Sequence, residues 1–500
     1  MKTILILLDT LRKDCLKIYN DESKAITPNI DILANDSVVF DNHCTGSMPC
    51  MPARRDILTG NLDFFERFWA GLEPFDLPLT HNLSDSGVKT HIITDHYHYW
   101  EIGGEGYLQS YDTFEMIRGN ETDPYIANYA NIEAPDKLNG NFKKQFEINL
   151  NSFKSKEDYP TVKTFLSAAD FMEKNIDRED FFLQIEGFDP HEPFATPKEF
   201  LDLYGISEDD LKEYYNSPKY GECTDTEEEL EFIRNKYLAN VSFADYAVGI
   251  ILTKLKKLKI YDECTIILTT DHGLHLGEHN VMGKGTANLY NEVSEIPLLI
   301  KTAKNDHFRV NNFTQNIDLM PTILDMYNVN LETKINGCSL KPLLNRDKSY
   351  MTRECAVSGY HGASVMLKSN EYTLFVAPVR EDNTPLFHYS AMPSMFRGYF
   401  GAKRSLLPID PKYIESGHFL SKSKMPVYKV PFAFEGVKSF HVNKHIVSQL
   451  FKNSDVEQLN PIVDKVVEER LKIKLVEIMS DLDVPQEQYQ RLGLINYQNN

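Results

Sequence analysis

The stretch from Cys44 to Gly60 holds the residues whose types and spacing most directly suggest chemistry. Within it, Cys50, Pro52, Arg54 and the pair Thr59-Gly60 stand in the arrangement C-x-P-x-R-x4-T-G. Proline is favourable in the first turn of a helix, and a helix N-terminus presents free N–H groups that favour negative charge. A cysteine and an arginine at such a position suit the binding of an anion, or attack on one.

Acidic residues that follow apolar runs are the next candidates. Asp9 comes directly after the run Lys2–Leu8, and Asp271-His272 comes directly after the run 265–270. In open α/β sheets, ligands bind at the carboxyl ends of the strands. Each residue also has an ordinary structural explanation, because a free cysteine is usually a small buried hydrophobe and Asp9 can serve as a helix N-cap. The residues alone therefore leave both interpretations open.

Further segments make the pattern specific. In chain order they are Thr27-Pro28-Asn29-Ile30-Asp31, Asp189-Pro190-His191-Glu192-Pro193, Asp271-His272-Gly273 and Gly283-Lys284-Gly285. Together with the cysteine motif, they resemble the type I sulfatases, a branch of the alkaline-phosphatase superfamily, over most of the first 345 residues. The resemblance implies that Cys50 is oxidised to formylglycine, an aldehyde that hydrates to a gem-diol. A formylglycine-generating or sulfatase-maturating enzyme would then be a partner.

The resemblance also assigns roles to individual residues. It implies catalytic roles for Cys50, Arg54, His191 and Lys284, and a single divalent metal held by Asp9, Asp271, His272 and Cys50. Oxygen-rich ligands favour Ca²⁺, our first choice, while the histidine leaves Mn²⁺, Mg²⁺ and Zn²⁺ as alternatives. Thr10 stands where the family has a second acidic residue, so we do not expect it to be a direct ligand. We place His275 and His279 around the metal ligands or on the substrate side.

The loop after the strand at 88–94 departs from the family pattern. Asp95 and Tyr97 stand where many sulfatases carry a lysine and a histidine that bind sulfate. The neighbouring residues His96 and His98 are therefore predicted to bind substrate instead. The competing interpretation is an aromatic, half-buried loop without a chemical role.

The implied reaction is the hydrolysis of a sulfate monoester in a surface cleft, with a sugar as the alcohol by family analogy. Such a reaction needs charge neutralisation, a nucleophile and a proton donor for the leaving group. A second hypothesis is the hydrolysis of phosphonate monoesters or phosphodiesters by the same formylglycine site, since those relatives also lack the Lys-x-His element. A third is a binding protein that has lost catalysis. The presence of nucleophile, acid, arginine and lysine argues against this third hypothesis.

The elements that position these residues predict an α/β fold. Apolar runs at Lys2–Leu8, 181–185, 265–270 and 293–300 indicate buried parallel strands. We expect a large, mostly parallel sheet flanked by helices, alkaline-phosphatase-like by resemblance, over residues 1–345. Residues 346–500 are predicted to form a smaller C-terminal α+β subdomain with an antiparallel sheet, built from strands at 354–358, 363–367 and 372–377 and a helix at 463–482. Residues 378–435 could cover the mouth of the pocket or make a subunit contact, and the sequence does not distinguish the two.

Composition limits the partners and the compartment. The net charge of −20 argues against nucleic acid and anionic membrane as partners. Seven scattered cysteines without a disulfide or zinc spacing favour a reducing environment. The first apolar run is too short for a signal peptide and no run approaches the ~20 residues of a spanning helix, so we expect a cytoplasmic protein. The oligomeric state is left open.

Overall fold

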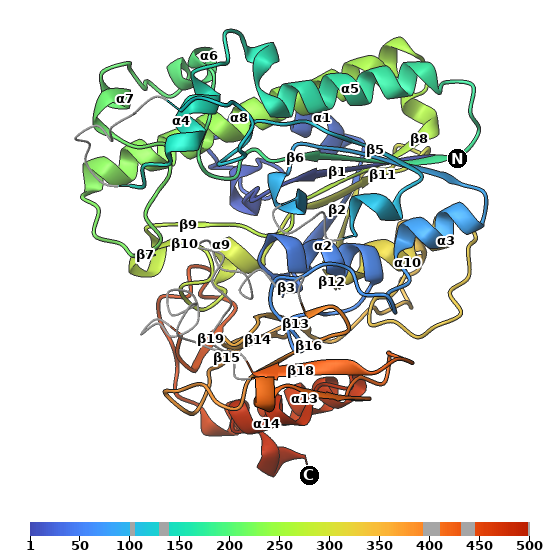
Figure 1. Cartoon of the computed structure of the whole chain (residues 1–500), viewed down its shortest axis with the longest axis vertical. Helices are drawn as coiled ribbons and strands as arrows, with labels where there is room; N and C mark the ends of the chain where they lie inside the picture. The colour runs from blue at the N-terminus through green and yellow to red at the C-terminus, as the bar shows by residue number, and fades with distance from the viewer. Residues whose placement is uncertain (101–105, 130–139, 394–410, 432–445, 499–500) are drawn as a thin grey trace.

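The computed structural model describes residues 1–100, 106–129, 140–393, 411–431 and 446–498. Its centre is an eight-stranded sheet in the order β12-β2-β11-β8-β1-β6-β4-β5 (Figure 1). The strands are β1 (Lys2–Leu8), β2 (Val38–Cys44), β4 (Lys89–Thr94), β5 (Thr113–Met116), β6 (Phe181–Gly187), β8 (Cys264–Thr269), β11 (Leu298–Lys301) and β12 (Phe308–Gln315).

The strands of this sheet are mostly parallel, as predicted. β1 pairs in parallel with β6 and β8, with Lys2 opposite both Phe181 and Cys264, while β11 runs antiparallel to its neighbours β2 and β8. Side chains of β1 alternate between two apolar cores, with Leu5 and Leu7 in one core and Ile4 and Ile6 in the other. Because β1, β6 and β8 are in parallel register, their carboxyl ends meet at one edge of the sheet.

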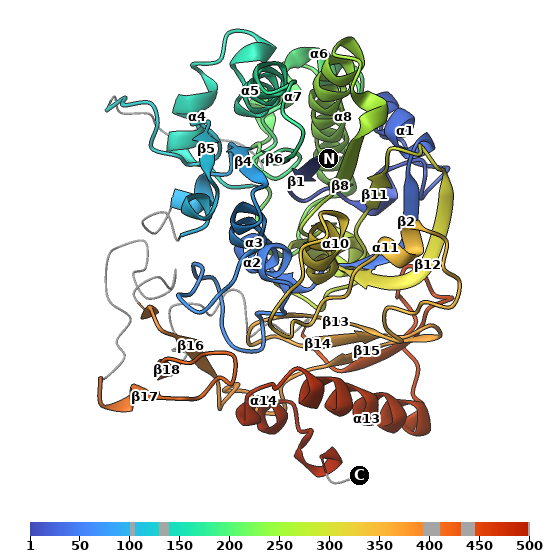
Figure 2. The ribbon, with the colours of Figure 1, turned by 90° about the vertical axis from the view of Figure 1, so that its right-hand side faces the viewer.

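Helices cover both faces of the sheet (Figures 1 and 2). One face carries α1 (Pro28–Asn35), α5 (Pro160–Lys174) and α8 (Glu227–Lys257), and the other carries α2 (Cys50–Thr59), α3 (Leu79–Asp85) and α10 (Leu319–Met326). α8 begins at a capping box in which the Thr226 hydroxyl oxygen accepts a hydrogen bond from the Glu229 backbone N–H and the Glu229 carboxylate accepts one from the Thr226 backbone N–H. By length and composition α8 is the one helix of the described residues that could cross a membrane. It is mostly buried against α1, α5 and the apolar core, as a core helix would be.

A second sheet lies in the C-terminal part and has the strand order β19-β15-β14-β13-β3. Its strands are β3 (Ser47–Met48), β13 (Ala356–Tyr360), β14 (Val365–Lys368), β15 (Tyr372–Val376) and β19 (Gln449–Lys452). The helix α13 (Lys465–Asp481) packs on it through Leu471 and Leu475 (Figure 2). The predicted antiparallel sheet and terminal helix are confirmed. β3 joins this sheet next to Cys50, and the domain boundary at 345/346 stays a prediction.

Two small sheets complete the described chain. β16 (Phe387–Ser390), β17 (Glu415–Gly417) and β18 (Val427–Pro431) form an antiparallel sheet within the segment 378–435, of which residues 394–410 and 432–435 lie outside the described residues. β7 (Gly221–Glu222) pairs with β10 (Val281–Gly283), which pairs with β9 (His275–Leu276). This last sheet fixes the polar insertion 194–229 against the loop that carries Lys284.

Candidate active site

The ends of β1 and β8 and the start of α2 bring the four predicted metal ligands together. Asp9, Cys50, Asp271 and His272 are all buried, and one ligand atom of each lies within 4.8 Å of the others. Nδ1 of His272 lies 3.0 Å from the carbonyl oxygen of Gly273, to which it donates in the neutral tautomer, so the lone pair of Nε2 is available to a metal. Two carboxylates and one imidazole are a donor set that fits a divalent cation.

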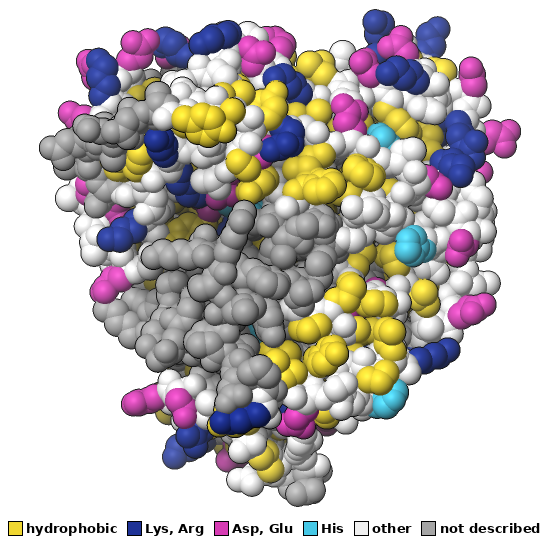
Figure 3. Space-filling view, viewed as in Figure 1, with side chains coloured by type: hydrophobic (Ala, Val, Ile, Leu, Met, Phe, Trp, Pro, Cys, Tyr) yellow, Lys and Arg dark blue, Asp and Glu magenta, His cyan; other side chains and the backbone are white. Residues whose placement is uncertain are grey.

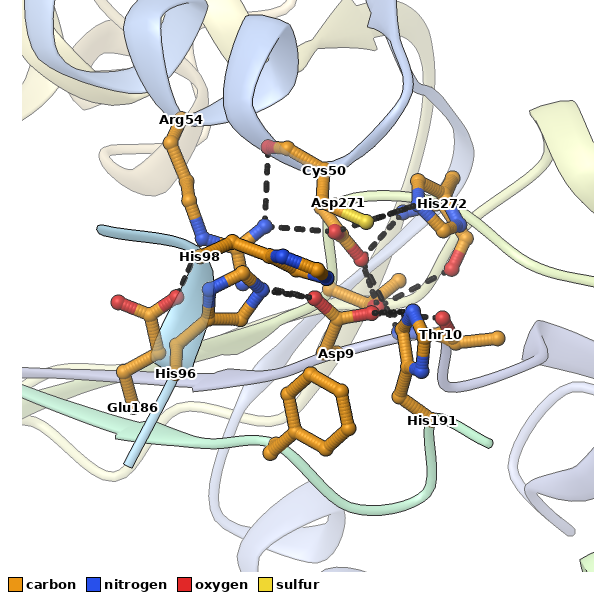
Figure 4. Close-up of polar contacts among 12 residues, drawn as sticks. Asp9, Thr10, Cys50, Arg54, His96, His98, Glu186, His191, Asp271 and His272 are labelled. Atoms are coloured by element: carbon orange, nitrogen blue, oxygen red, sulfur yellow. Dashed lines mark hydrogen bonds and ion pairs between the residues drawn. The ribbon is translucent and has the colours of Figure 1, made fainter. Parts of the chain in front are cut away.

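Arg54 links these groups from the first turns of α2 (Figure 4). Its guanidinium donates to Oδ2 of Asp9 at 2.8 Å, to Oδ2 of Asp271 at 2.7 Å and to the carbonyl oxygen of Cys50 at 2.9 Å. It also donates to Glu186, a third buried carboxylate, whose pKa burial raises above its ordinary value. Burial acts to raise the pKa of Asp9 too, but the charges of His191 and Arg54 hold it well below its ordinary value.

The site carries an excess of negative charge. Three carboxylates (Asp9, Asp271 and Glu186) surround the guanidinium of Arg54, and the ammonium of Lys284 is the second cation beside them, 3.2 Å from Oγ1 of Thr10. Buried charges need partners of opposite sign. A bound divalent cation would supply the missing positive charge, which agrees with the donor set.

Cys50 is buried rather than in a surface cleft, which corrects the sequence-based expectation. The residue is 1% exposed and belongs to one of the two apolar cores of the main sheet. Its Sγ lies 3.3 Å from Nε2 of His272. Burial and the nearby negative charge of Asp9 raise the pKa of the thiol well above its ordinary value.

Thr10 is positioned by an unusual backbone conformation and does not take the place of an acidic ligand. Its φ angle of 64° lies in the left-handed region, which is costly for a β-branched residue. In this conformation its backbone N–H donates to Oδ1 of Asp271 at 3.0 Å and its hydroxyl donates to Oδ1 of Asp9 at 2.6 Å. Thr10 therefore orients both carboxylates, as expected for a residue next to the predicted ligands.

His191 and Lys284 both lie beside Glu192. Nδ1 of His191 hydrogen-bonds to the backbone oxygen of Glu192, and Nε2 faces Oδ1 of Asp9 at 3.9 Å. Nζ of Lys284 lies 4.0 Å from Oε1 of Glu192. Burial lowers the pKa of Lys284, but the acidic groups around it, Cys50 first and then Glu192, Asp9 and Asp271, outweigh burial and raise the pKa above its ordinary value. Lys284 is thus a fixed positive charge beside the site.

The loop after β4 contributes His96 and His98, and both are buried rather than half-buried. Nε2 of His96 lies 2.9 Å from Oδ2 of Asp9, on the side of that carboxylate opposite His191 (Figure 4). His98 reaches further out, with Nε2 at 3.2 Å from Oε2 of Glu121. The structure thus brings His96 to the centre of the site and His98 to its edge. Substrate binding by either residue stays a prediction.

Asp95 points away from this centre. It accepts hydrogen bonds from the Phe188 backbone N–H and the Thr161 hydroxyl, each at 2.8 Å. Burial, and then the charge of Asp189, raise the pKa of Asp95 to about 8. The residue at the family's lysine position is therefore part of a buried carboxyl pair that braces the loop, and it offers no cation to a sulfate group.

His275 and His279 lie around another carboxylate. Their Nε2 atoms are 3.9 and 3.5 Å from Oε2 of Glu292, and His279 stacks on Tyr290 with ring centres 3.6 Å apart. Glu292 and His279 line a groove of about 720 Å³ that also contains Arg12 and Glu278. This position corresponds to neither the metal ligands nor the residues facing His191.

Two residues at the site were not predicted from the sequence. Glu186 lies in the fully buried β6, where an ionisable residue is a signal in itself because charged side chains are almost never buried unpaired. Tyr220 comes from the insertion 194–229, and its hydroxyl donates to Glu192. A side chain at Gly283 would collide with the Tyr220 ring, since an added Cβ would lie 2.4 Å from it, so this glycine permits the contact. No sequence signal indicates the Tyr220 contact.

Comparison with known proteins decides the family. A family model described as Sulfatase matches residues 2–329, and one described as N-sulphoglucosamine sulphohydrolase, C-terminal, matches residues 277–392. The chain belongs to the sulfatase family. This sulfatase is 25% identical to an arylsulfatase of Clostridium perfringens over 393 residues, which are 69% of this chain and 79% of that protein. The predicted family and enzyme class are confirmed.

Other similar proteins are described with different activities. The multifunctional alkaline phosphatase superfamily protein PehA of Trinickia caryophylli is 24% identical over 469 residues, covering 79% of this chain and 88% of that protein. A solved structure with its substrate D-glucosamine-2-N,6-O-disulfate has a TM-score of 0.64 at 17% identity, covering 100% of this chain and 98% of that one. The phosphonate monoester hydrolase of Agrobacterium radiobacter has a TM-score of 0.61 at 19% identity, covering 75% and 87%. These structural likenesses confirm the α/β fold.

Proposed function

We propose that this sulfatase hydrolyses a sulfate monoester of a sugar with formylglycine at position 50 and one divalent metal. Asp9, Asp271, His272 and residue 50 would hold the metal, with Ca²⁺ as the first candidate. The metal would supply positive charge beside the sulfate oxygens, and hydrated formylglycine would supply a hydroxyl nucleophile. A maturating enzyme that converts Cys50 is the implied partner, and the cytoplasm is the proposed compartment.

Three residues of the chain supply the other functions that the reaction needs. Arg54 holds Asp9 and Asp271 in place and supplies charge behind residue 50. Lys284 is a fixed cation beside the sulfuryl group. It stabilises the negative charge on the sulfuryl oxygens in the transition state. His191 is placed to deliver a proton from Nε2 to the departing alcohol oxygen, because the carbonyl of Glu192 holds its other ring nitrogen.

The observation that carries this proposal is the environment of Cys50. Its thiol stands at the first residue of α2, inside the cluster of predicted metal ligands and 3.3 Å from Nε2 of His272. A nucleophile made from this side chain would therefore lie next to the bound metal. The similarity to an arylsulfatase supports sulfate as the group transferred.

The competing function is hydrolysis of phosphonate monoesters, which the fold-level likeness to a phosphonate monoester hydrolase keeps open. We expect kcat/KM for 4-nitrophenyl sulfate to exceed that for 4-nitrophenyl phenylphosphonate by about 10²-fold or more, the scale of a few kcal/mol of transition-state discrimination. Both substrates release the same phenol, so their ratio reports only on the transferred group. A ratio below one would assign the enzyme to the phosphonate branch.

The roles of His191 and Lys284 predict different dependence on the leaving group. A general acid contributes about 10²–10⁴-fold when the leaving alcohol is poor and little when it is activated. His191→Ala should therefore reduce hydrolysis of a sugar sulfate far more than that of 4-nitrophenyl sulfate. Lys284→Ala should reduce both to a similar degree, because it acts on the sulfuryl group that they share. Equal losses for the two substrates in His191→Ala would remove His191 from the acid role and point to His96 or His98.

A further inference from the structure

Two carboxylates near His191 have no role in the reaction steps given above: that of Glu192, which is buried, and that of Glu121, which is 11% exposed. Oε2 of Glu192 lies 3.5 Å from Nδ1 of His191. His98 lies between Glu121 and His191. Its Nε2 is 3.2 Å from Oε2 of Glu121, and its ring centre is 6.4 Å from that of His191. Burial lowers the pKa of His191, and the negative charges of Glu192 and Glu121 both act in the opposite direction, so both are within electrostatic reach of it.

Each carboxylate has one oxygen committed to the protein. Oε1 of Glu121 accepts a hydrogen bond from Nζ of Lys143 at 2.7 Å, and Oε1 of Glu192 accepts one from the hydroxyl of Tyr220. The second oxygen of Glu192, Oε2, is buried and accepts no hydrogen bond from any described residue, and beside the buried Oε2 of Glu121 lies only Nε2 of His98, at 3.2 Å, among those residues. Unsatisfied buried acceptors are rare and costly, which makes a ligand that donates hydrogen bonds a physical explanation for this pair.

We propose that Glu192 and Glu121 form a subsite for the leaving alcohol, and that it selects a neutral sugar ring whose hydroxyls donate to the two Oε2 atoms. The inference rests on the proposed function, because the alcohol must lie on the side from which His191 protonates it. An ionised carboxylate only accepts hydrogen bonds, and sugar hydroxyls are donors of suitable size.

The same arrangement disfavours an anionic neighbour of the ester. Lys143 and Tyr220, the donors that an anion would need, already donate to Glu121 and Glu192. A uronate carboxylate or a second sulfate in this subsite would face two like charges in a poorly solvated environment, where repulsion is strong. The subsite thus distinguishes neutral sugars from uronic acids and from sugars with adjacent sulfates.

Binding to the Cys50→Ala protein tests the subsite without turnover. Calorimetric titration in the presence of Ca²⁺ would compare monosulfates of glucose and galactose, each with its matched uronate and with analogues that lack one hydroxyl. We expect a neutral sugar sulfate to bind about tenfold or more tightly than its uronate. Glu192→Gln or Glu121→Gln, and deletion of the hydroxyl that faces it, should each weaken binding about tenfold, the scale of a hydrogen bond to a charged acceptor.

Non-additive losses in binding free energy would show that a sugar hydroxyl and a carboxylate contact each other directly. Removing both the hydroxyl and its carboxylate should cost little more than removing either, because the two changes abolish one interaction.

Glu222→Gln on the exposed strand β7 is the matched control and should change binding less than about twofold, as surface substitutions usually do. Binding of 4-nitrophenyl sulfate to the Cys50→Ala protein reports on the sulfate site alone, so its loss would count against the proposed function. If 4-nitrophenyl sulfate binds but uronates bind as tightly as neutral sugars, or the two losses are additive, the subsite is overturned.

Discussion

Cys50→Ala is expected to reduce sulfate ester hydrolysis by about 10³-fold or more, because it removes the side chain from which the nucleophile is made. The fold should persist. Cys50 is small and lies at the start of a helix, so alanine removes one sulfur atom from a packed site. We expect the free energy of unfolding to fall by about 1 kcal/mol, typical of a single substitution. The measurements are kcat/KM for 4-nitrophenyl sulfate and the denaturant midpoint.

A suitable control for this variant is Cys44→Ala. Cys44 is equally buried and lies in the same motif-bearing stretch, but it belongs to β2 and packs with Phe313 and Ala356. It should keep most of its activity at a similar cost in stability. Near-normal activity in Cys50→Ala, or equal loss in both variants, would remove Cys50 from the role of nucleophile.

Metal removal should have the second large effect. Chelation is expected to abolish hydrolysis, and Asp271→Asn should lower kcat/KM by about 10²-fold or more, as loss of groups that hold a catalytic metal does. Asp271 is at the centre of the site, since its carboxylate meets both Arg54 and the backbone N–H of Thr10. Metal content per protein chain gives a readout that does not depend on activity. Re-addition of Ca²⁺, Mg²⁺, Mn²⁺ and Zn²⁺ in turn would identify the ion.

His275→Ala and His279→Ala are the controls for the metal assignment. Both histidines face Glu292 rather than the cluster around Asp9, so both variants should retain the bound metal. If either variant lost the metal while Asp271→Asn kept it, the ligand set of Asp9, Asp271, His272 and residue 50 would be wrong.

The strands that carry the site could be predicted because fully buried parallel strands are continuous apolar runs. β1 and β8 follow this rule, and Asp9 and Asp271 follow their carboxyl ends, whereas β6 departs from it at Gln184 and Glu186. Boundaries were less certain. α2 begins at Cys50 itself rather than near Pro52, and the run expected as a strand from residue 293 starts with α9 (Asn291–Ser294) before β11 begins at Leu298. Short apolar runs do not distinguish a helix from a strand by period.

The contacts that could not be predicted join residues far apart in the chain. Tyr220 reaches Glu192 because β7 pairs with β10, and pairing between distant short strands leaves no periodic signal. The hydrogen bond from Thr161 on α5 to Asp95 also joins distant segments of the chain. The position of Asp95 in a polar, aromatic loop therefore did not indicate that it is buried. The site residues came from motif resemblance and spacing, while their partners required the tertiary structure.

The most direct test of the central claim is the mass of the peptide that contains Cys50, measured across preparations of different specific activity. We predict that part of this peptide carries an aldehyde or its hydrate in place of the thiol, and that sulfatase activity rises in proportion to the converted fraction. Co-expression with a maturating enzyme should raise both together. Full activity in a preparation whose Cys50 is entirely unmodified cysteine would contradict the account.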